Sequence, residues 1–114
     1  MTTNNNYKIA VLGAGSFGTV IANMLAVNGF ATTLWMRSDK QLQAINSSGE
    51  NAAYLPGYQF DPTLRFTTEL EQALEGADTV FFAVPSSALR QVAKLAKAWI
   101  NTDALLISTA KGIE

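Results

Sequence analysis

Residues 9–18 of the chain read IAVLGAGSFG, so that a short apolar run leads directly into a Gly-x-Gly-x-x-Gly turn. Apolar side chains then recur at helical spacing, and a strand, this turn and a helix together are typical of a dinucleotide-binding unit. Gly13 lets the chain reverse tightly, Gly15 leaves no Cβ in the way of a pyrophosphate, and Gly18 lets the helix lie close to the strand. The backbone N–H groups at the helix start would then face the phosphates. The simpler alternative is an ordinary glycine turn between a strand and a helix.

The composition limits the chemistry that the chain can perform. It has 114 residues, enough for one domain, and its net charge of −1 comes from 8 Lys and Arg against 9 Asp and Glu. That balance offers no basic surface to attract nucleic acid, so no nucleic-acid partner is expected. Cysteine and histidine are both absent, which excludes disulfides, thiolate chemistry and the usual zinc ligands. A general acid or base must therefore be Lys, Asp, Glu or Tyr, and no metal site is expected.

The N-terminal residues bear on the location of the protein. Residues 2–6 read TTNNN and lack the basic region and the long apolar core of a secretory signal. No apolar run in the chain approaches the roughly 20 residues that a membrane-spanning helix needs. We therefore expect no membrane span and a cytoplasmic protein.

Apolar periodicity and turn residues divide the rest of the chain into alternating strands and helices. Strands are predicted at residues 8–12, 31–36, 64–67, 79–84 and 104–108. Helices are predicted at about residues 16–28, 39–45, 68–74 and 86–100. The strand at 79–84 is apolar throughout, which favours a central strand covered on both faces. The strand at 104–108 is expected to be buried as well.

Local motifs add detail at three places. Ser38 or Asp39 can cap the second helix, and Thr68 with Glu71 three residues later resembles a capping box for the third. The segment 50–62 contains turn-forming residues and is predicted to be an ordered excursion whose aromatic side chains pack onto the sheet. The turn formers are Pro56-Gly57 and Asp61-Pro62, and the aromatic residues are Tyr54, Tyr58 and Phe60.

The order of the elements predicts an α/β fold: a Rossmann-like, doubly wound parallel sheet with right-handed crossovers, in one domain over residues 1–114. Ligands of such sheets bind beyond the C-terminal ends of the strands. The loops that should carry the chemistry are therefore 13–18, 35–37, 84–87 and 109–112. The predicted sheet stops after the fifth strand, without the elements of a complete second nucleotide-binding half. We accordingly expect a truncated sheet, from the N-terminal part of a larger protein.

Arg37 stands where an NAD-selective fold usually has an Asp or Glu, about 20 residues beyond the glycines. A guanidinium cannot accept hydrogen bonds from the adenosine ribose, but it can pair with a 2′-phosphate and stack on adenine. The expected cofactor is thus NADP or NAD, with NADPH favoured. The alternative is a solvent-facing arginine that tolerates either cofactor. Asp39 is expected to cap a helix, although it lies near enough in the sequence to reach the ribose.

Two further loops follow strands at the same edge of the predicted sheet. Pro85 sets the exit of the chain where the nicotinamide half would pass, and Ser86 or Ser87 can cap the next helix or touch the ligand. Lys111 follows the last strand, so its ammonium group should project over the same crevice. There it could bind a phosphate or polarise a carbonyl. A plain surface lysine is the alternative interpretation.

Five motifs, in this order, resemble the N-terminal domain of bacterial NAD(P)-dependent glycerol-3-phosphate dehydrogenases. They are GAGSFGT at 13–19, LWMR at 34–37, Asn51 with YLPG at 54–57, AVPS at 83–86 and AKGIE at 110–114. The glycine turn alone is shared with many dehydrogenases. The ordered combination is much more specific, and it covers nearly the whole chain.

The resemblance implies reversible hydride transfer between NAD(P)H and dihydroxyacetone phosphate, which gives sn-glycerol 3-phosphate for phospholipid synthesis. Ser16 and Phe17 match family positions that contact the cofactor at the phosphate loop, and Arg37 matches the adenosine-side position. Lys111 matches a lysine that contacts both cofactor and substrate. The predicted cofactor-binding residues are thus Gly13, Gly15, Ser16, Phe17, Gly18, Arg37, Pro85 and Lys111, and Lys111 is also the predicted substrate contact.

The same resemblance implies parts that this chain is not expected to contain. The family has a helical C-terminal domain, which carries the proton-donating lysine and most of the substrate-phosphate site. We therefore expect no catalytic residue within the 114 residues and a chain that is inactive by itself. The complete enzyme is expected to be a homodimer.

Three other functions are compatible with parts of the pattern. Another two-domain dehydrogenase, such as a hydroxyacid or ketopantoate reductase, shares the glycine turn. A stand-alone nucleotide-binding or sensory module without catalysis would fit the length of the chain. A methyltransferase fits less well, because Arg37 stands where an acidic ribose partner is expected and the third glycine is in place.

Overall fold

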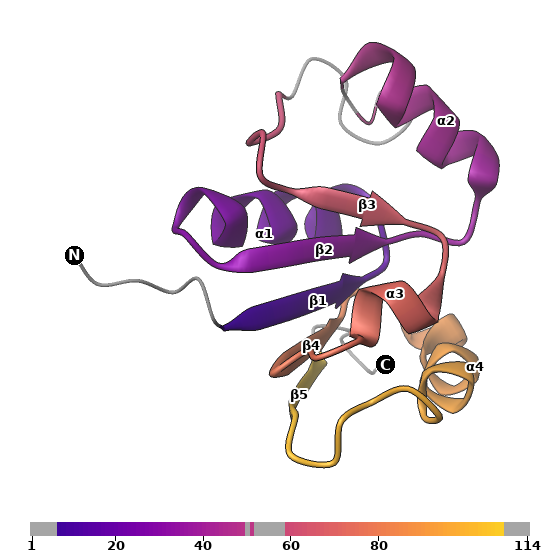
Figure 1. The fold of residues 1–114 in the computed structure, drawn as a ribbon. Helices are drawn as coiled ribbons and strands as arrows, with labels where there is room; N and C mark the ends of the chain where they lie inside the picture. Colours follow the sequence, from indigo (N-terminus) through magenta and orange to yellow (C-terminus); the bar gives the residue numbers. More distant parts are fainter. Residues whose placement is uncertain (1–6, 50, 52–58, 109–114) are drawn as a thin grey trace.

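The computed structural model describes residues 7–49, 51 and 59–108, which form one parallel sheet with helices packed against it (Figure 1). The five strands lie in the order β3-β2-β1-β4-β5, and every neighbouring pair is parallel. The elements, in chain order, are β1 (Lys8–Leu12), α1 (Ser16–Val27), β2 (Ala31–Trp35), α2 (Asp39–Ser48), β3 (Arg65–Thr67), α3 (Leu70–Leu74), β4 (Thr79–Phe82), α4 (Ser86–Ala96) and β5 (Leu105–Ser108). This topology confirms the Rossmann-like α/β fold.

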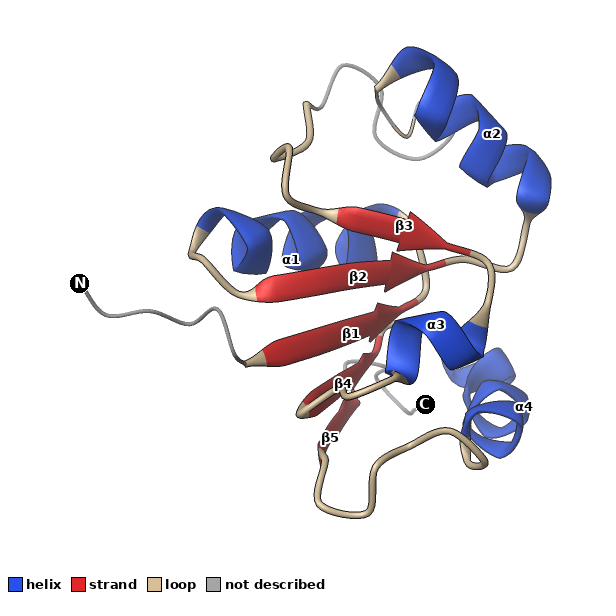
Figure 2. Ribbon diagram, viewed as in Figure 1, coloured by secondary structure: helices blue, strands red, loops and turns tan. Residues whose placement is uncertain are grey.

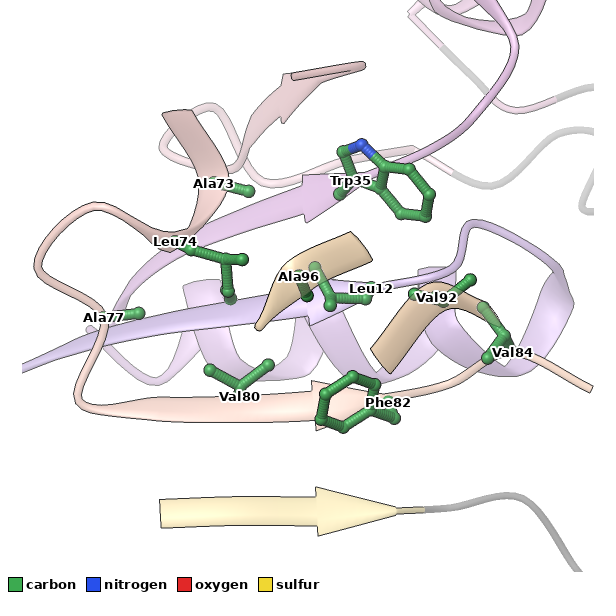
Figure 3. Close-up of a cluster of buried hydrophobic side chains, with 11 residues drawn as sticks. Leu12, Trp35, Ala73, Leu74, Ala77, Val80, Phe82, Val84, Val92 and Ala96 are labelled. Carbon is green, nitrogen blue, oxygen red and sulfur yellow. The ribbon is translucent and has the colours of Figure 1, made fainter. Parts of the chain in front are cut away.

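The sheet is covered on both faces because alternate side chains of its strands point to opposite sides. In β1, Ile9 and Val11 join a buried cluster with residues of α1 and α2. Ala10 and Leu12 belong to a second cluster, which includes residues of α3 and α4 and is shown in Figure 3. The continuous apolar run of β1 is thus the mark of a central strand buried on both sides.

The order of the strands places a crevice at one edge of the sheet. β2 and β3 follow β1 on one side of the sheet, after which the chain crosses to add β4 and β5 on the other side. All neighbouring strands are parallel, as the arrowheads of β1, β2 and β3 show in Figure 2, so the loops after β1 and β4 open at the same edge of the sheet. Such a reversal of strand order is where open α/β sheets bind their ligands.

Most element boundaries agree with the sequence to within three residues. β1 has the predicted limits, and Ser38 caps α2 as predicted, since its Oγ accepts a hydrogen bond of 3.1 Å from the Gln41 N–H. α2 continues three residues beyond its predicted end, to Ser48, where Gly49 closes it with a positive φ of 77°. The last helix is shorter than predicted and ends at Ala96.

The predicted capping box at Thr68 is wrong. The N-cap of α3 is Glu69, without a side-chain hydrogen bond from that residue. The Glu69 N–H instead donates to the hydroxyl of Thr67, one residue earlier than predicted, over 3.0 Å. The hydroxyl of Thr68 donates to the Asp39 carboxylate, also over 3.0 Å, because the fold brings the start of α2 to this loop.

The prediction that the last strand is buried is also wrong. In β5, Leu105 is 57% exposed and Leu106 is 53% exposed. Among the described strands, β5 is at the edge of the sheet and pairs with β4 alone. In Figure 3 it lies beside the buried cluster without contributing a labelled side chain. An apolar run identifies a strand, but the burial of that strand depends on how many strands pair with it, which its position in the sheet determines.

The excursion between α2 and β3 is described only at Asn51 and from residue 59 onward. Asp61 is tied to α1, because its N–H donates to the Asn23 side-chain oxygen over 2.6 Å. Phe60 packs edge-on against Phe66 with ring centroids 5.0 Å apart, as expected for an aromatic residue that holds a loop to the sheet. The predicted turn at Pro56-Gly57 and the side chains of Tyr54 and Tyr58 lie outside the described residues.

Within the part of the chain that the structure describes, we find no helix whose length and apolar character would let it cross a bilayer.

Candidate functional site

An open cavity of about 490 Å³ lies at the crevice beyond the C-terminal ends of β1, β2 and β4. Residues of the β1–α1, β2–α2 and β4–α4 junctions line it together. It brings together seven of the eight predicted cofactor-binding residues, namely Gly13, Gly15, Ser16, Phe17, Gly18, Arg37 and Pro85. The eighth, Lys111, lies outside the described residues.

Two glycines of the turn are required by the protein itself. Gly13 has a φ of 120°, and a Cβ there would lie 2.6 Å from the carbonyl oxygen of Ala83, at the end of β4. A Cβ on Gly18 would lie 1.9 Å from the carbonyl oxygen of Gly13. Side chains cannot approach backbone atoms so closely. These contacts confirm the tight reversal at Gly13 and the close packing of α1 expected at Gly18.

Gly15 differs, because no contact among the described residues requires a glycine there. Its φ of −77° suits any residue, and it is the N-cap of α1. An added Cβ would have no atom within 4 Å, so the space in front of Gly15 is open. Gly15 also lines the cavity. Open space beside a helix N-terminus is what a bound pyrophosphate requires.

A buried network of amide and hydroxyl groups lies behind the turn. The Asn51 Nδ2 group donates to the carbonyl oxygen of Ala14 over 2.9 Å and to the hydroxyl of Thr19 over 3.0 Å. The Gln41 Nε2 group donates to the same Ala14 oxygen and to the Asn51 side-chain oxygen, both over 3.0 Å. Asn51 is only 1% exposed, and its partners come from the β1–α1 junction, α1 and α2.

The sequence alone did not assign this network. In the sequence Asn51 belongs to one of the family motifs, and Gln41 belongs to none of them. The sequence shows only that an asparagine stands beside a segment rich in turn-forming residues. An asparagine in such a place is more often a solvent-exposed loop residue than a buried one.

Arg37 is the second residue after β2, and it is exposed and lines the cavity. The start of α2 lies next to it, with Ser38 as the N-cap. Asp39 does not line the cavity, and its carboxylate accepts the hydrogen bond from Thr68. The described arrangement therefore presents a cation, rather than this carboxylate, at the end of β2.

The β4–α4 junction forms the opposite wall. Pro85 is the N-cap of α4, and the start of this helix has no side-chain cap, so the expectation that Ser86 or Ser87 caps it is wrong. Pro85 stands before the helix in an extended conformation, with φ −58° and ψ 151°, and its carbonyl oxygen accepts a hydrogen bond of 2.9 Å from the Ala88 N–H. Ser86 is exposed and lines the cavity.

A larger hollow of about 660 Å³ lies across the free edge of β3 and contains none of the predicted site residues. Its lining includes Lys8 and Ala31, the first residues of β1 and β2. It thus reaches the N-terminal ends of these strands, whereas parallel sheets bind ligands at the C-terminal ends. We therefore take the smaller cavity at the glycine turn as the candidate site.

Comparisons with known proteins identify the family of this chain. Residues 8–114 match the sequence family described as the NAD-dependent glycerol-3-phosphate dehydrogenase N-terminus. A glycerol-3-phosphate dehydrogenase [NAD(P)+] of Pseudomonas aeruginosa is 50% identical over 106 residues, which are 93% of this chain and 31% of that protein. The enzyme of the same name from Saccharophagus degradans is 43% identical over 111 residues, which are 97% of this chain and 31% of that protein.

A solved structure shows the same likeness in three dimensions. The crystal structure of glycerol-3-phosphate dehydrogenase from Coxiella burnetii aligns with a TM-score of 0.88 and 34% identity, covering 94% of this chain and 33% of that one. The chain therefore spans about a third of the length of the curated relatives it matches. It belongs to the NAD-dependent glycerol-3-phosphate dehydrogenase family and corresponds to the N-terminal, NAD(P)-binding domain of those enzymes.

Proposed function

We propose that the cavity between the β1–α1 and β4–α4 junctions binds NADPH in preference to NADH, with the pyrophosphate over residues 13–18. The observation that carries this proposal is Gly15, where the protein leaves open space at the N-terminus of α1 although its own packing does not require a glycine. The backbone N–H groups of the first helical turn and the positive end of the helix dipole favour an anion at that place.

Arg37 supports the preference for NADPH. Its guanidinium group stands at the adenosine end of the cavity, and the nearest carboxylate in the sequence, Asp39, is bonded to Thr68. A guanidinium can bind a 2′-phosphate through two parallel hydrogen bonds, whereas the ribose hydroxyls of NADH would lack an acidic acceptor there.

The nicotinamide half is assigned to the other wall. Pro85 and Ser86 line the cavity beyond β4, and the exposed Phe17 lies at the start of α1. We place Lys111 at the reactive end because it follows β5 in the sequence and matches the family lysine that contacts cofactor and substrate. Its ammonium group would stabilise the negative charge that develops on the carbonyl oxygen of a ketone substrate.

The reaction proposed for the complete enzyme is reduction of dihydroxyacetone phosphate to sn-glycerol 3-phosphate. The bound nicotinamide supplies the hydride. The substrate oxygen must also receive a proton, and the chain contains no histidine to donate one. By the resemblance, the proton-donating lysine belongs to a C-terminal helical domain, so the 114 residues should bind the cofactor without reducing the ketone.

The decisive experiment compares three proteins: the 114-residue chain, a complete enzyme that contains it, and the Lys111→Ala form of that enzyme. NADPH binding is followed by fluorescence titration and turnover by NADPH oxidation with dihydroxyacetone phosphate. We expect the short chain to bind but not turn over, and Lys111→Ala to reduce turnover strongly while largely keeping cofactor affinity. Full activity in the short chain would refute the need for a second domain. Unchanged turnover in Lys111→Ala would show that Lys111 is an ordinary surface residue without a role in the reaction.

The proposal also covers the metabolic role, the location and the oligomeric state of the complete enzyme. The product, sn-glycerol 3-phosphate, is the backbone of glycerophospholipids, so we assign the enzyme to their synthesis in the cytoplasm. We also propose that the complete enzyme is a homodimer. Light scattering measures its mass directly, and a monomer at working concentration would overturn that part of the proposal.

A further inference from the structure

The carbonyl groups of Ala14 and Gly15 in the glycine turn accept hydrogen bonds from side chains, two of which are distant in the sequence. The Ala14 oxygen accepts two hydrogen bonds, from the amide groups of Asn51 and Gln41, at 2.9 and 3.0 Å. The Gly15 oxygen accepts two as well, from the backbone N–H of Thr19 at 3.0 Å and from the Thr19 hydroxyl at 2.6 Å. Asn51 links these donors, since its amide also bonds to the side chains of Gln41 and Thr19.

The direction of these bonds determines where the backbone N–H groups point. In a trans peptide the C=O and the following N–H point in opposite directions, because the unit is planar. The bonds to the Ala14 oxygen therefore direct the Gly15 N–H away from Asn51, and the bonds to the Gly15 oxygen direct the Ser16 N–H away from Thr19. Gly15 and Ser16 both line the cavity. Preorganised backbone donors of this kind stabilise an anion without having to reorient when it binds.

We propose that Asn51, supported by Gln41 and Thr19, is a positioning residue that holds the turn in its pyrophosphate-binding shape. This inference rests on the proposed function, because it concerns the same cavity. It adds a role for a residue that does not itself line the cavity. Asn51 also carries no charge, so it acts on the cofactor only through the peptide groups that it orients.

The chain contains a matched control for this role. Asn23 is likewise buried, at 8% exposure, and its side-chain oxygen accepts the Asp61 N–H over 2.6 Å. It thereby ties the segment before β3 to α1, as Asn51 ties the segment after α2 to the turn. Asn23 does not line the cavity. A purely structural role for both residues predicts similar losses of stability and no selective effect of either on the cofactor.

The test measures two ligands by calorimetry on the wild-type, Asn51→Ala and Asn23→Ala chains, below the melting temperature of each. NADPH contains the pyrophosphate, whereas adenosine 2′-monophosphate carries only the phosphate proposed to meet Arg37. We expect Asn51→Ala to weaken NADPH about 10- to 100-fold, the range for misplaced binding groups. Its affinity for adenosine 2′-monophosphate should stay within about 3-fold of wild type, and Asn23→Ala should leave both affinities unchanged.

Three results would overturn the inference: wild-type affinity of folded Asn51→Ala for NADPH, equal losses for both ligands, or the same NADPH loss in Asn23→Ala. If Asn51→Ala does not fold, Thr19→Val answers the same question, because it removes the hydroxyl from the network with little change of volume. It should also weaken NADPH selectively, and an unchanged affinity would overturn the inference equally. Failure of the wild-type chain to bind NADPH would instead refute the proposed function itself.

Discussion

The two strand-to-helix junctions that face each other across the cavity are built in opposite ways. The junction after β1 contains three glycines and is backed by Asn51 and Gln41, so that its shape follows from close backbone contacts and buried hydrogen bonds. The junction after β4 reads Pro85-Ser86-Ser87, with all three residues exposed and no side-chain cap on α4. Its shape follows mainly from the fixed φ of proline.

The difference shows which wall tolerates change. A side chain added to a glycine of the first junction would clash with backbone atoms or occupy the ligand space. The start of α4 receives no side-chain cap, so removing side-chain atoms from the second junction should leave this helix start unchanged. Substitutions on the two sides should therefore differ widely in effect.

The largest effect is expected for Gly18→Ala. Alanine is favoured over glycine in a helix by about 1 kcal/mol, but the new Cβ would lie 1.9 Å from the Gly13 carbonyl oxygen. Because backbone atoms must move, we expect the free energy of unfolding to fall by about 3 kcal/mol or more. Urea denaturation measures this loss. Gly15→Ala is the control and should be close to neutral, because its Cβ meets no atom. Equal stability of the two variants would show that α1 can shift away from the turn.

Gly15→Val should separate binding from folding. The backbone at Gly15 has a φ of −77°, so valine is not strained there, and the variant should keep its circular dichroism spectrum. Its side chain would occupy the space proposed for the pyrophosphate. We expect a loss of at least about 3 kcal/mol in the free energy of dinucleotide binding, or more than 100-fold in affinity. Retained affinity by calorimetry would show that the turn does not hold the phosphates.

Arg37→Ala tests the adenosine end, where a cation takes the place of the expected carboxylate. Losing a charged hydrogen bond should weaken NADPH more than NADH, by about 1 to 3 kcal/mol. Fluorescence titrations with both cofactors measure the difference. Arg65→Ala is the matched control, since Arg65 is exposed and lies by the other hollow, and it should change neither affinity. Equal losses for both cofactors in Arg37→Ala would rule out the 2′-phosphate contact.

The smallest effect on stability is expected for Ser86→Ala. The side chain makes no cap bond at the start of α4, so its removal should change the free energy of unfolding by no more than about 0.5 kcal/mol. Ser38→Ala provides the contrast, because the Ser38 hydroxyl caps α2 through the Gln41 N–H, and its loss should cost about 1 kcal/mol. Thermal unfolding distinguishes the two. A similar loss in both would mean that Ser86 supports α4 in a way that the described contacts do not include.

Much of the fold could be predicted because its signals are local. The limits of β1 follow from its apolar run, and the start of α2 follows from Ser38. The predicted loops at Gly13, Arg37 and Pro85 do meet at one cavity, since parallel strands bring their C-terminal ends to one edge. The capping box at Thr68 was wrong because Asp39, from a distant part of the chain, engages that hydroxyl.

By itself the sequence determined the alternation of strands and helices, the glycine turn and the cation after β2, because each depends on residues within a few positions of one another. Only the tertiary structure decided that β5 is an exposed edge while β1, of similar composition, is buried. It likewise placed Asn51 behind the turn, 37 residues from Ala14. The physical reason is the same in both cases. Burial and hydrogen bonding depend on which segments become neighbours in space, and local periodicity does not specify those neighbours.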